Sequence, residues 1–302
     1  SWSPNPANFS TPGQTFIINS STTLTSNWSV TGNGSRIIIG DGLNAREFTI
    51  PSNFTLTTGT NVVVDVKNKA KLYISNATTP NLGNLEIGRP ANFPNSGNAE
   101  IPGSEVIYNY SGAQTIYPAN YYKLTISGAR TGTPSITFAP ATISCSGILS
   151  LTATGCNWVT TGSTIVFDGA WSQTIPAFTY YNLHTELGGA KNLGGNITIT
   201  NNFRIGAITT FNAGANTINL TKSGTVVTLV GTFNPGTSTV NYSNAASTSI
   251  CAMNYHNLNI SGGDRIIQPS NITSISGTFT TGAGLITTTE STFQFNGSSN
   301  SQ

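Results

Sequence analysis

Short apolar runs separated by turn residues dominate the hydrophobic pattern of this chain. In the first hundred residues, runs such as FIIN, WSV, RIIIG and FTI recur about every ten residues between Gly- and Asn-containing turns. The segment 62–74 alternates, so that Val64 and Leu72 fall on one side while Asp65 and Lys71 fall on the other. Alternation with a period of two residues is the pattern of a β-strand. Since no long stretch of helix-forming residues accompanies these runs, the pattern predicts an all-β protein.

A longer repeat is superimposed on these strands. The segment 106–128, VIYNYSGAQTIYPANYYKLTISG, returns with changes at 165–189 and at 239–263, and a fourth copy starts at Thr292. The marker aromatics of the four copies are separated by 59, 75 and 53 residues. These markers are Tyr108, Phe167, Tyr242 and Phe295. Self-similarity over tens of residues predicts a repeat architecture in which each unit buries its apolar face against its neighbours.

The unequal spacing of the copies favours one repeat fold over another. A parallel β-solenoid, or β-helix, of stacked short strands tolerates inserted loops and inserted turns, whereas tandem β-sandwich repeats need a more constant length. We therefore predict a parallel β-solenoid, with tandem β-sandwich repeats as the alternative. The predicted sections are a β-rich capping or solenoid section at 1–104 and a repeat solenoid at 105–302. The units of the second section are 105–163, 164–236, 237–290 and a partial unit at 291–302.

Composition points to a protein that works outside the cell. Only 7% of the residues are charged, against about 25% in ordinary soluble domains, and Asn, Ser, Thr and Gly supply the polarity instead. A net charge of +2 is too small to attract nucleic acid. No apolar run approaches the length of a membrane span, and the N-terminal SWSPNPANF lacks the apolar core of a signal peptide. We expect a secreted, mature chain at the outer cell surface, with no nucleic-acid partner and no membrane span.

The three cysteines leave two interpretations open. Cys145 and Cys156 are close enough in sequence for a disulfide that closes a short loop, while Cys251 stands apart. Alternatively, all three are separate thiols that pack as small apolar side chains. No spacing of Cys and His suggests a metal site, and no cofactor is expected.

Acidic residues and histidines are few and scattered. The best candidate catalytic group is His184 with Glu186, which lie two residues apart and hence on one face of a strand, together with Asp168 in the preceding strand. The other copies carry Thr125 and Asn259 at the position of His184, which is the behaviour of a variable, solvent-facing position. The sequence offers these three residues as weak catalytic candidates only.

Paired aromatics recur at the same place in each copy. Because consecutive strand residues point to opposite sides, one member of each pair is expected in the core and the other on the surface. A surface column of such rings would either bind the flat face of a sugar or support the stack through cross-strand contacts. The candidate ligand-binding residues are Tyr121, Tyr122, Tyr180, Tyr181 and Tyr255, with His256 replacing the second ring of the third pair.

The repeat resembles a known class of surface protein. The elements Gln114–Ile116 and Gln173–Ile175, the YYxL motifs at 121–124 and 180–183, and the stretch 193–199 are similar to the tandem units of large surface proteins of Bacteroidota. That resemblance covers about residues 104–302 and implies export by a type IX-like system and a role in adhesion, gliding or fibre formation. Because the chain stops inside the fourth copy, we expect a fragment of a longer protein or strands supplied by another molecule.

Together these features lead to a ranked expectation. The first is a non-enzymatic, extracellular structural or adhesive protein, a segment or subunit of a cell-surface fibre. Its partners would be other copies, neighbouring repeats of the same protein, or surface glycans. The alternatives are a carbohydrate-active β-helix enzyme, and a carbohydrate- or ice-binding module with regular side-chain columns.

Overall fold

The computed structural model is an all-β solenoid, as predicted. It describes residues 8–51, 54, 56–58, 62–66, 70–74, 85–86, 105–108, 112–116, 118, 120–267, 272–288 and 290–297. The described strands pair in parallel and make about 11 turns, each of which we call a coil. The chain divides into two compact units, Ser1–Thr161 and Gly162–Gln302, which are described separately. The sequence boundary proposed at residue 104 lies inside the first unit, where β9 pairs directly with β11.

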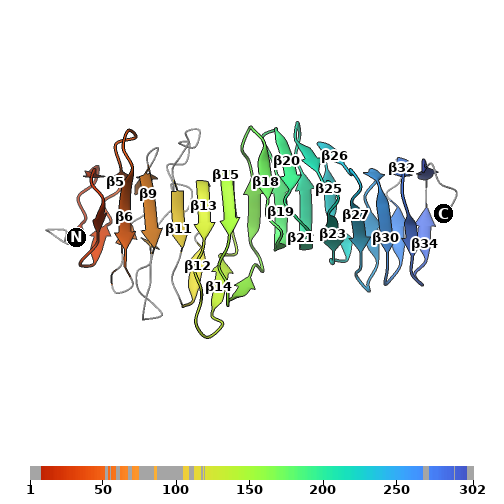
Figure 1. The fold of residues 1–302 in the computed structure, drawn as a ribbon, viewed down its shortest axis with the longest axis horizontal. Helices are drawn as coiled ribbons and strands as arrows, with labels where there is room; N and C mark the ends of the chain where they lie inside the picture. The colour runs from red at the N-terminus through yellow and green to blue at the C-terminus, as the bar shows by residue number, and fades with distance from the viewer. Residues whose placement is uncertain are drawn as a thin grey trace. The chain divides into compact units, whose positions relative to one another are not determined.

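The first unit contains one long sheet and three shorter ones (Figure 1). Its long sheet has the order β3 (Thr22–Thr23), β6 (Arg46–Ile50), β9 (Ala70–Ile74), β11 (Glu105–Tyr108), β13 (Asn120–Ile126) and β15 (Thr142–Leu151). The shorter sheets are β2 (Thr15–Ile18), β5 (Arg36–Ile39) and β8 (Val63–Val66); β1 (Asn8–Phe9), β4 (Trp28–Val30), β7 (Leu56–Thr58) and β10 (Leu85–Glu86); and β12 (Gln114–Ile116), β14 (Ser135–Phe138) and β16 (Asn157–Val159).

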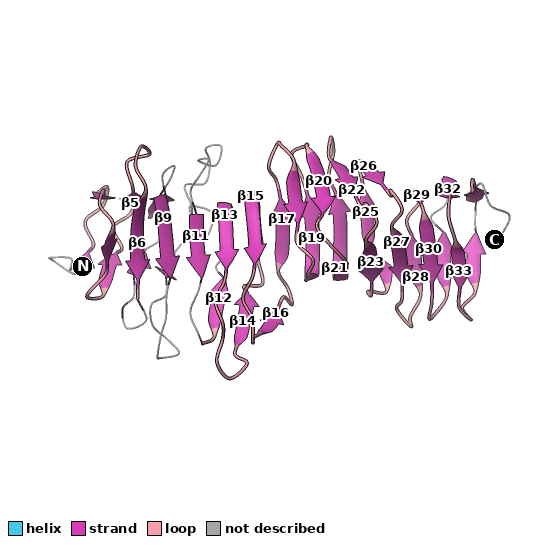
Figure 2. Cartoon of the chain, viewed as in Figure 1, coloured by secondary structure: helices cyan, strands magenta, loops and turns pink. Residues whose placement is uncertain are grey.

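The second unit repeats this arrangement (Figure 2). Its long sheet has the order β17 (Thr164–Phe167), β19 (Thr179–Thr185), β21 (Ile197–Ile205), β23 (Thr217–Leu220), β27 (Thr239–Tyr242), β30 (Asn257–Ile260) and β33 (Phe279–Thr281), and β25 (Val227–Leu229) pairs with the second half of β21. The shorter sheets are β18 (Gln173–Ile175), β20 (Ala190–Leu193), β22 (Thr210–Asn212) and β26 (Thr232–Asn234); β24 (Gly224–Thr225), β28 (Thr248–Ile250), β31 (Arg265–Ile267) and β34 (Ile286–Thr288); and β29 (Asn254–Tyr255), β32 (Ile272–Ile275) and β35 (Thr292–Phe295).

The apolar core follows from the alternation within each strand. In β23, Ile218 and Leu220 are each 1% exposed, while the intervening Asn219 is only half-buried. The alternating segment 62–74 behaves in the same way, since Val64 and Leu72 are fully buried. That segment supplies two strands, β8 and β9, which belong to different sheets. Two of its lysines, Lys67 and Lys69, lie outside the described residues.

Each copy of the sequence repeat corresponds to a single coil. In the first copy, β11, β12 and β13 follow one another, and Tyr108 pairs with Ile126, eighteen residues later. The same separation joins Phe167 to Thr185 and Tyr242 to Ile260. The coils between the copies have other lengths, which explains the unequal spacing of the markers. The fourth copy differs, because β35 belongs to the sheet of β29 and β32.

The strand that pairs with the C-terminal side of each YYxL strand, β15 or β21, contains one extra residue, a β-bulge. In β13 and β15, Tyr121 pairs with Cys145 and Lys123 with Ile148, so β15 holds one residue more than β13 across this stretch. A shift of the same size separates the pairs Tyr180–Ile199 and Asn182–Asn202. Bulges of this kind bend a strand and redirect its side chains. In the first two copies they therefore mark the point where the paired aromatics diverge.

Candidate functional site

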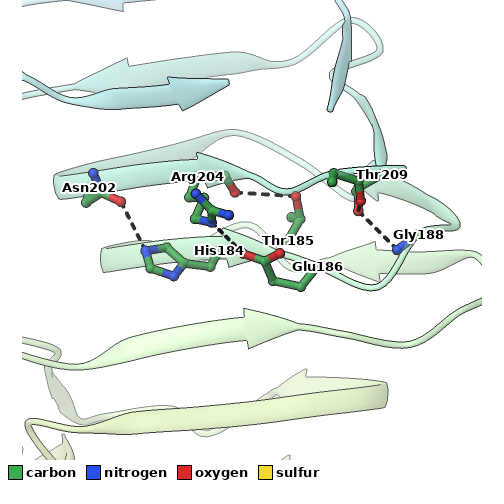
Figure 3. Close-up of polar contacts among 8 residues, drawn as sticks. His184, Thr185, Glu186, Gly188, Asn202, Arg204 and Thr209 are labelled. Carbon is green, nitrogen blue, oxygen red and sulfur yellow. Dashed lines mark hydrogen bonds and ion pairs between the residues drawn. The ribbon is translucent and has the colours of Figure 1, made fainter. Parts of the chain in front are cut away.

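His184 and Glu186 point to the same, outer side of β19, as their spacing predicts (Figure 3). The residue between them, Thr185, is fully buried. Register places His184 opposite Arg204 on the neighbouring strand β21. His184, Glu186, Asn202 and Arg204 form what we call the polar cluster.

The imidazole of His184 is held by an amide. Its Nε2 atom lies 3.0 Å from Oδ1 of Asn202. Burial lowers the pKa of His184 below its ordinary 6.5, although the Asn202 contact and the Glu186 carboxylate oppose this shift. His184 is therefore mainly neutral at pH 7, and its Nε2 carries the proton that the Asn202 oxygen accepts.

Glu186 is engaged in an ion pair. Nε of Arg204 donates to Oε1 of Glu186 at 2.6 Å, and both side chains are about one-third exposed. A partly exposed pair of this kind contributes about 0–1 kcal/mol to stability. The Glu186 carboxylate accepts this hydrogen bond from a guanidinium cation, so in this contact it is an acceptor and not a proton donor.

Asp168 directly follows β17, the neighbour of β19 on the side away from β21. The carbonyl of the preceding Phe167 accepts a hydrogen bond from the Glu186 amide at 2.9 Å. Its charge acts on Lys191, whose pKa it raises against the effect of burial. The structure thus brings together two of the three catalytic candidates and associates the third with a buried lysine.

A buried cation beside each repeat coil is the feature that sequence reasoning missed. Arg130, Lys191 and Arg265 are each buried, and each follows the YYxL strand of its copy by a similar distance. The Lys191 ammonium donates to the carbonyls of Gly188, at 2.8 Å, and Gly169. The signal was present in the sequence, as a basic residue after the glycine turn of each of the first three copies.

The cations at the other two positions also bind carbonyls. Nη2 of Arg130 donates to the carbonyl of Tyr108 at 3.3 Å, and Nη2 of Arg265 donates to that of Tyr242, also at 3.3 Å. Arg265 further donates to carbonyls of the turns at 244–246 and 261–264. Buried carbonyls need donors, and a cation satisfies several at once. These cations therefore join the turns of successive coils through hydrogen bonds to backbone carbonyls, which is a structural role.

The first members of the aromatic pairs are core residues. Tyr121 and Tyr180 are fully buried, and Tyr255 is 1% exposed. Their hydroxyls are satisfied internally; for example, that of Tyr255 donates to the carbonyl of Cys251 at 2.7 Å. This placement corrects the candidate ligand-binding role of these three tyrosines, because no sugar reaches a ring inside the core.

The second members are half-buried and do not form a column. Tyr181 belongs to β19 and His256 precedes β30, with β21, β23 and β27 between these strands in the sheet. Tyr122 in the first unit packs against Gly147 of the next coil, where an added Cβ would lie 3.1 Å from the ring. The described contacts favour a packing role for these rings over a continuous stacking platform for sugars.

The three cysteines are free thiols, which settles the open alternative against the Cys145–Cys156 disulfide. Cys145 and Cys251 are buried, and Cys156 is half-buried. Burial raises the pKa of the Cys251 thiol to about 11. Within the described residues, no three His, Cys, Asp or Glu side chains gather in a way that could hold a metal ion.

The first unit contains a cavity. It has a volume of about 450 Å³ and is lined by residues 15–20, Thr22 and Trp28. Among the described residues, no helix is long and apolar enough to cross a membrane.

No family model, curated protein or solved structure matches this chain.

Proposed function

We propose that this chain is a non-enzymatic structural or adhesive protein, a segment or subunit of an extracellular fibre at the cell surface. The observation that carries this proposal is the last coil of the second unit. Inward-facing residues of earlier coils, such as Leu258 and Ile275, are at most 1% exposed. By contrast, Phe279 and Phe293 of the last coil are half-buried, and Phe295 is 41% exposed.

These three phenylalanines form one apolar cluster. The ring centroids of Phe279 lie 5.4 Å from Phe293 and 5.7 Å from Phe295. Each is on a strand, β33 or β35, that has a single described neighbour. Such an edge offers unpaired backbone groups next to apolar side chains, which is the surface on which a parallel strand adds. The occupant we propose is a further coil, from neighbouring repeats of the same protein or from another copy.

The polar cluster also supports a role without catalysis. His184 and Glu186 are bound to Asn202 and Arg204, so both candidate groups are committed to cross-strand contacts. The resemblance of the repeats to surface proteins of Bacteroidota, and the low charge of the chain, support an extracellular location.

The edge can be tested with two matched variants. We expect the mass of the wild-type protein, measured by light scattering, to rise with protein concentration. Phe295→Lys should abolish this rise, because it places a charge on the edge. Trp171→Lys, which changes an exposed aromatic in a turn of the same unit, should behave as the wild type. A constant wild-type mass at all concentrations contradicts assembly between copies.

Catalysis and location are tested separately. Incubation with a panel of polysaccharides should release no products, whereas hydrolysis that is lost in Glu186→Gln would overturn the non-enzymatic assignment. Antibodies against the chain should label intact source cells. Labelling that needs permeabilised cells would contradict the surface location.

A further inference from the structure

The outer face of the second unit carries a regular array of uncharged polar side chains. Four segments, 217–221 (TINLT), 239–243 (TVNYS), 257–261 (NLNIS) and 278–282 (TFTTG), lie on successive strands of the long sheet. Their second and fourth residues occupy the inward positions, and the Ile, Leu, Val and Tyr residues there are at most 3% exposed in the first three segments. Their first, third and fifth residues are Thr, Asn, Ser and one Gly, which face outward. We call these outward positions the Thr/Asn face.

Strand register aligns this face into columns. Asn219 pairs with Asn241, Asn241 with Asn259, and Asn259 with Thr280. The first residues of the segments align in the same way, since Thr217 pairs with Thr239. The strands β23, β27, β30 and β33 lie side by side in Figure 2. The face is therefore a two-dimensional array and not a single stripe.

Backbone geometry fixes both repeat distances of the array. Neighbouring strands of a sheet are about 4.8 Å apart, and alternate residues of a parallel strand are about 6.6 Å apart. Hydrogen bonds between coils fix the side chains as well. Asn241 donates to Oδ1 of Asn219 at 2.7 Å, and the Thr278 hydroxyl donates to Oδ1 of Asn257 at 2.9 Å. The face is thus organised before any ligand arrives, which lowers the entropic cost of binding.

The chemistry of the face restricts what it can recognise. Its outward positions carry no ionisable group, so electrostatics gives no preference for an anionic or cationic partner. They also carry no aromatic ring on which the flat face of a sugar could stack. Instead they present hydroxyl and amide groups, which both donate and accept hydrogen bonds, next to the methyl groups of threonine. A partner that matches them is itself neutral, donates and accepts, and repeats in two dimensions.

We infer that the Thr/Asn face binds the surface of ice. The two repeat distances of the face are close to those at which equivalent oxygen atoms recur on a prism face of ordinary ice. Hydroxyl and amide groups at these positions hold water molecules in the places of lattice oxygens, and the threonine methyl groups limit competing arrangements. This inference uses a different part of the molecule from the edge of the last coil and is independent of fibre formation.

The test measures uptake of labelled protein into a slowly growing ice hemisphere. The wild-type protein should be enriched in the ice, whereas an inert labelled protein is rejected. Thr280→Lys, on the face, should lose this enrichment, because a charged side chain cannot enter the lattice. Thr287→Lys is the matched control, since Thr287 is an exposed threonine on β34 of the same coil but outside the face. It should be taken up like the wild type.

Two further variants separate binding from folding. Thr239→Lys probes the middle of the face, and Asn241→Thr keeps a small polar group there and should retain uptake. Circular dichroism before freezing shows whether each variant is folded. Rejection of the folded wild-type protein by ice overturns the inference, as does equal uptake of wild type and Thr280→Lys. Binding to insoluble chitin or cellulose that is lost in Thr280→Lys, without uptake into ice, would assign the face to a polysaccharide instead.

Discussion

Individual buried polar residues decide how the coils are joined. Lys191 has no exposed surface, and burial lowers its pKa from the ordinary 10.5 to about 8. Folding therefore favours the neutral amine, even though the ammonium has carbonyl partners. On the following strands of the same sheet, β22 and β26, Phe211 and Phe233 occupy the position that Lys191 has in β20, so the buried cation does not recur in those coils.

Lys191 should make stability depend on pH. Between about pH 8 and pH 10.5 the unfolded chain binds more protons at this site than the folded chain, so its contribution to the free energy of unfolding rises with pH. The slope is at most about 1.4 kcal/mol per pH unit. Urea unfolding of wild type and Lys191→Arg at pH 7.5, 9 and 10 measures the difference, because an arginine keeps a donor and does not titrate. If the difference in free energy of unfolding between wild type and Lys191→Arg does not change with pH, burial does not lower the pKa of Lys191.

The tyrosine pairs give a second expectation at this scale. The Tyr242 hydroxyl lies 3.0 Å from that of Tyr255 and accepts a hydrogen bond from the Cys251 amide at 3.3 Å. Tyr242→Phe leaves that buried amide without its acceptor, so we expect a loss of about 1–3 kcal/mol in the free energy of unfolding. The second copy carries Phe167 at this position and serves as the natural comparison. Phe167→Tyr should therefore change stability less than Tyr242→Phe, and the opposite order would contradict the role given to the hydroxyl.

At the scale of the elements, glycines make room for the residues beside the aromatic pairs, and Gly147 lies in the bulge opposite the first YYxL strand. A Cβ at Gly147 would lie 2.5 Å from the carbonyl oxygen of Tyr122, and one at Gly277 would lie 2.5 Å from Oδ1 of Asn257. We expect Gly147→Ala to cost about 1–3 kcal/mol, as an overpacked site does. Gly282→Ala is a milder control, because its nearest neighbour would be 3.3 Å away. Thermal unfolding of both variants should show the larger loss for Gly147→Ala, and equal losses would exclude a special fit at the bulge.

The elements also show how far the sequence could be interpreted. Alternation of apolar and polar residues was sufficient to predict β-strands, because burial on one side of each strand forces that pattern, and the unequal spacing of the copies favoured the parallel solenoid over tandem β-sandwiches. It also placed His184 and Glu186 on one face. Alternation could not show that His184 and Glu186 bind Asn202 and Arg204, because these partners lie on another strand, eighteen residues later in the sequence.

The sequence also carries a periodic signal for the Thr/Asn columns. TFN at 210–212 and 232–234 and TIN and TVN at 217–219 and 239–241 each recur after 22 residues, which is the length of one coil. The outward Thr and Asn of these motifs form the columns seen on two sheets. The paired aromatics suggested a surface column instead, because sequence alone could not show that bulges and intervening strands separate their second members.

For the whole molecule, the number of stacked coils is the main determinant of the buried apolar core and of stability. Each coil buries the inward residues of the one before it, as Leu258 is buried between β27 and β33. Stability is then close to a sum over coils and their interfaces. In the last described coil, which no described coil covers, Phe279 and Phe293 are only half-buried and Phe295 is exposed.

The most direct test of this account is electron microscopy of the purified protein over a range of concentrations. We expect filaments of constant width whose length increases with concentration, and we expect Phe295→Lys to prevent their growth. Particles of one size at every concentration, in the wild type as in the variant, would contradict the proposal that the edge of the last coil receives a further coil from another copy.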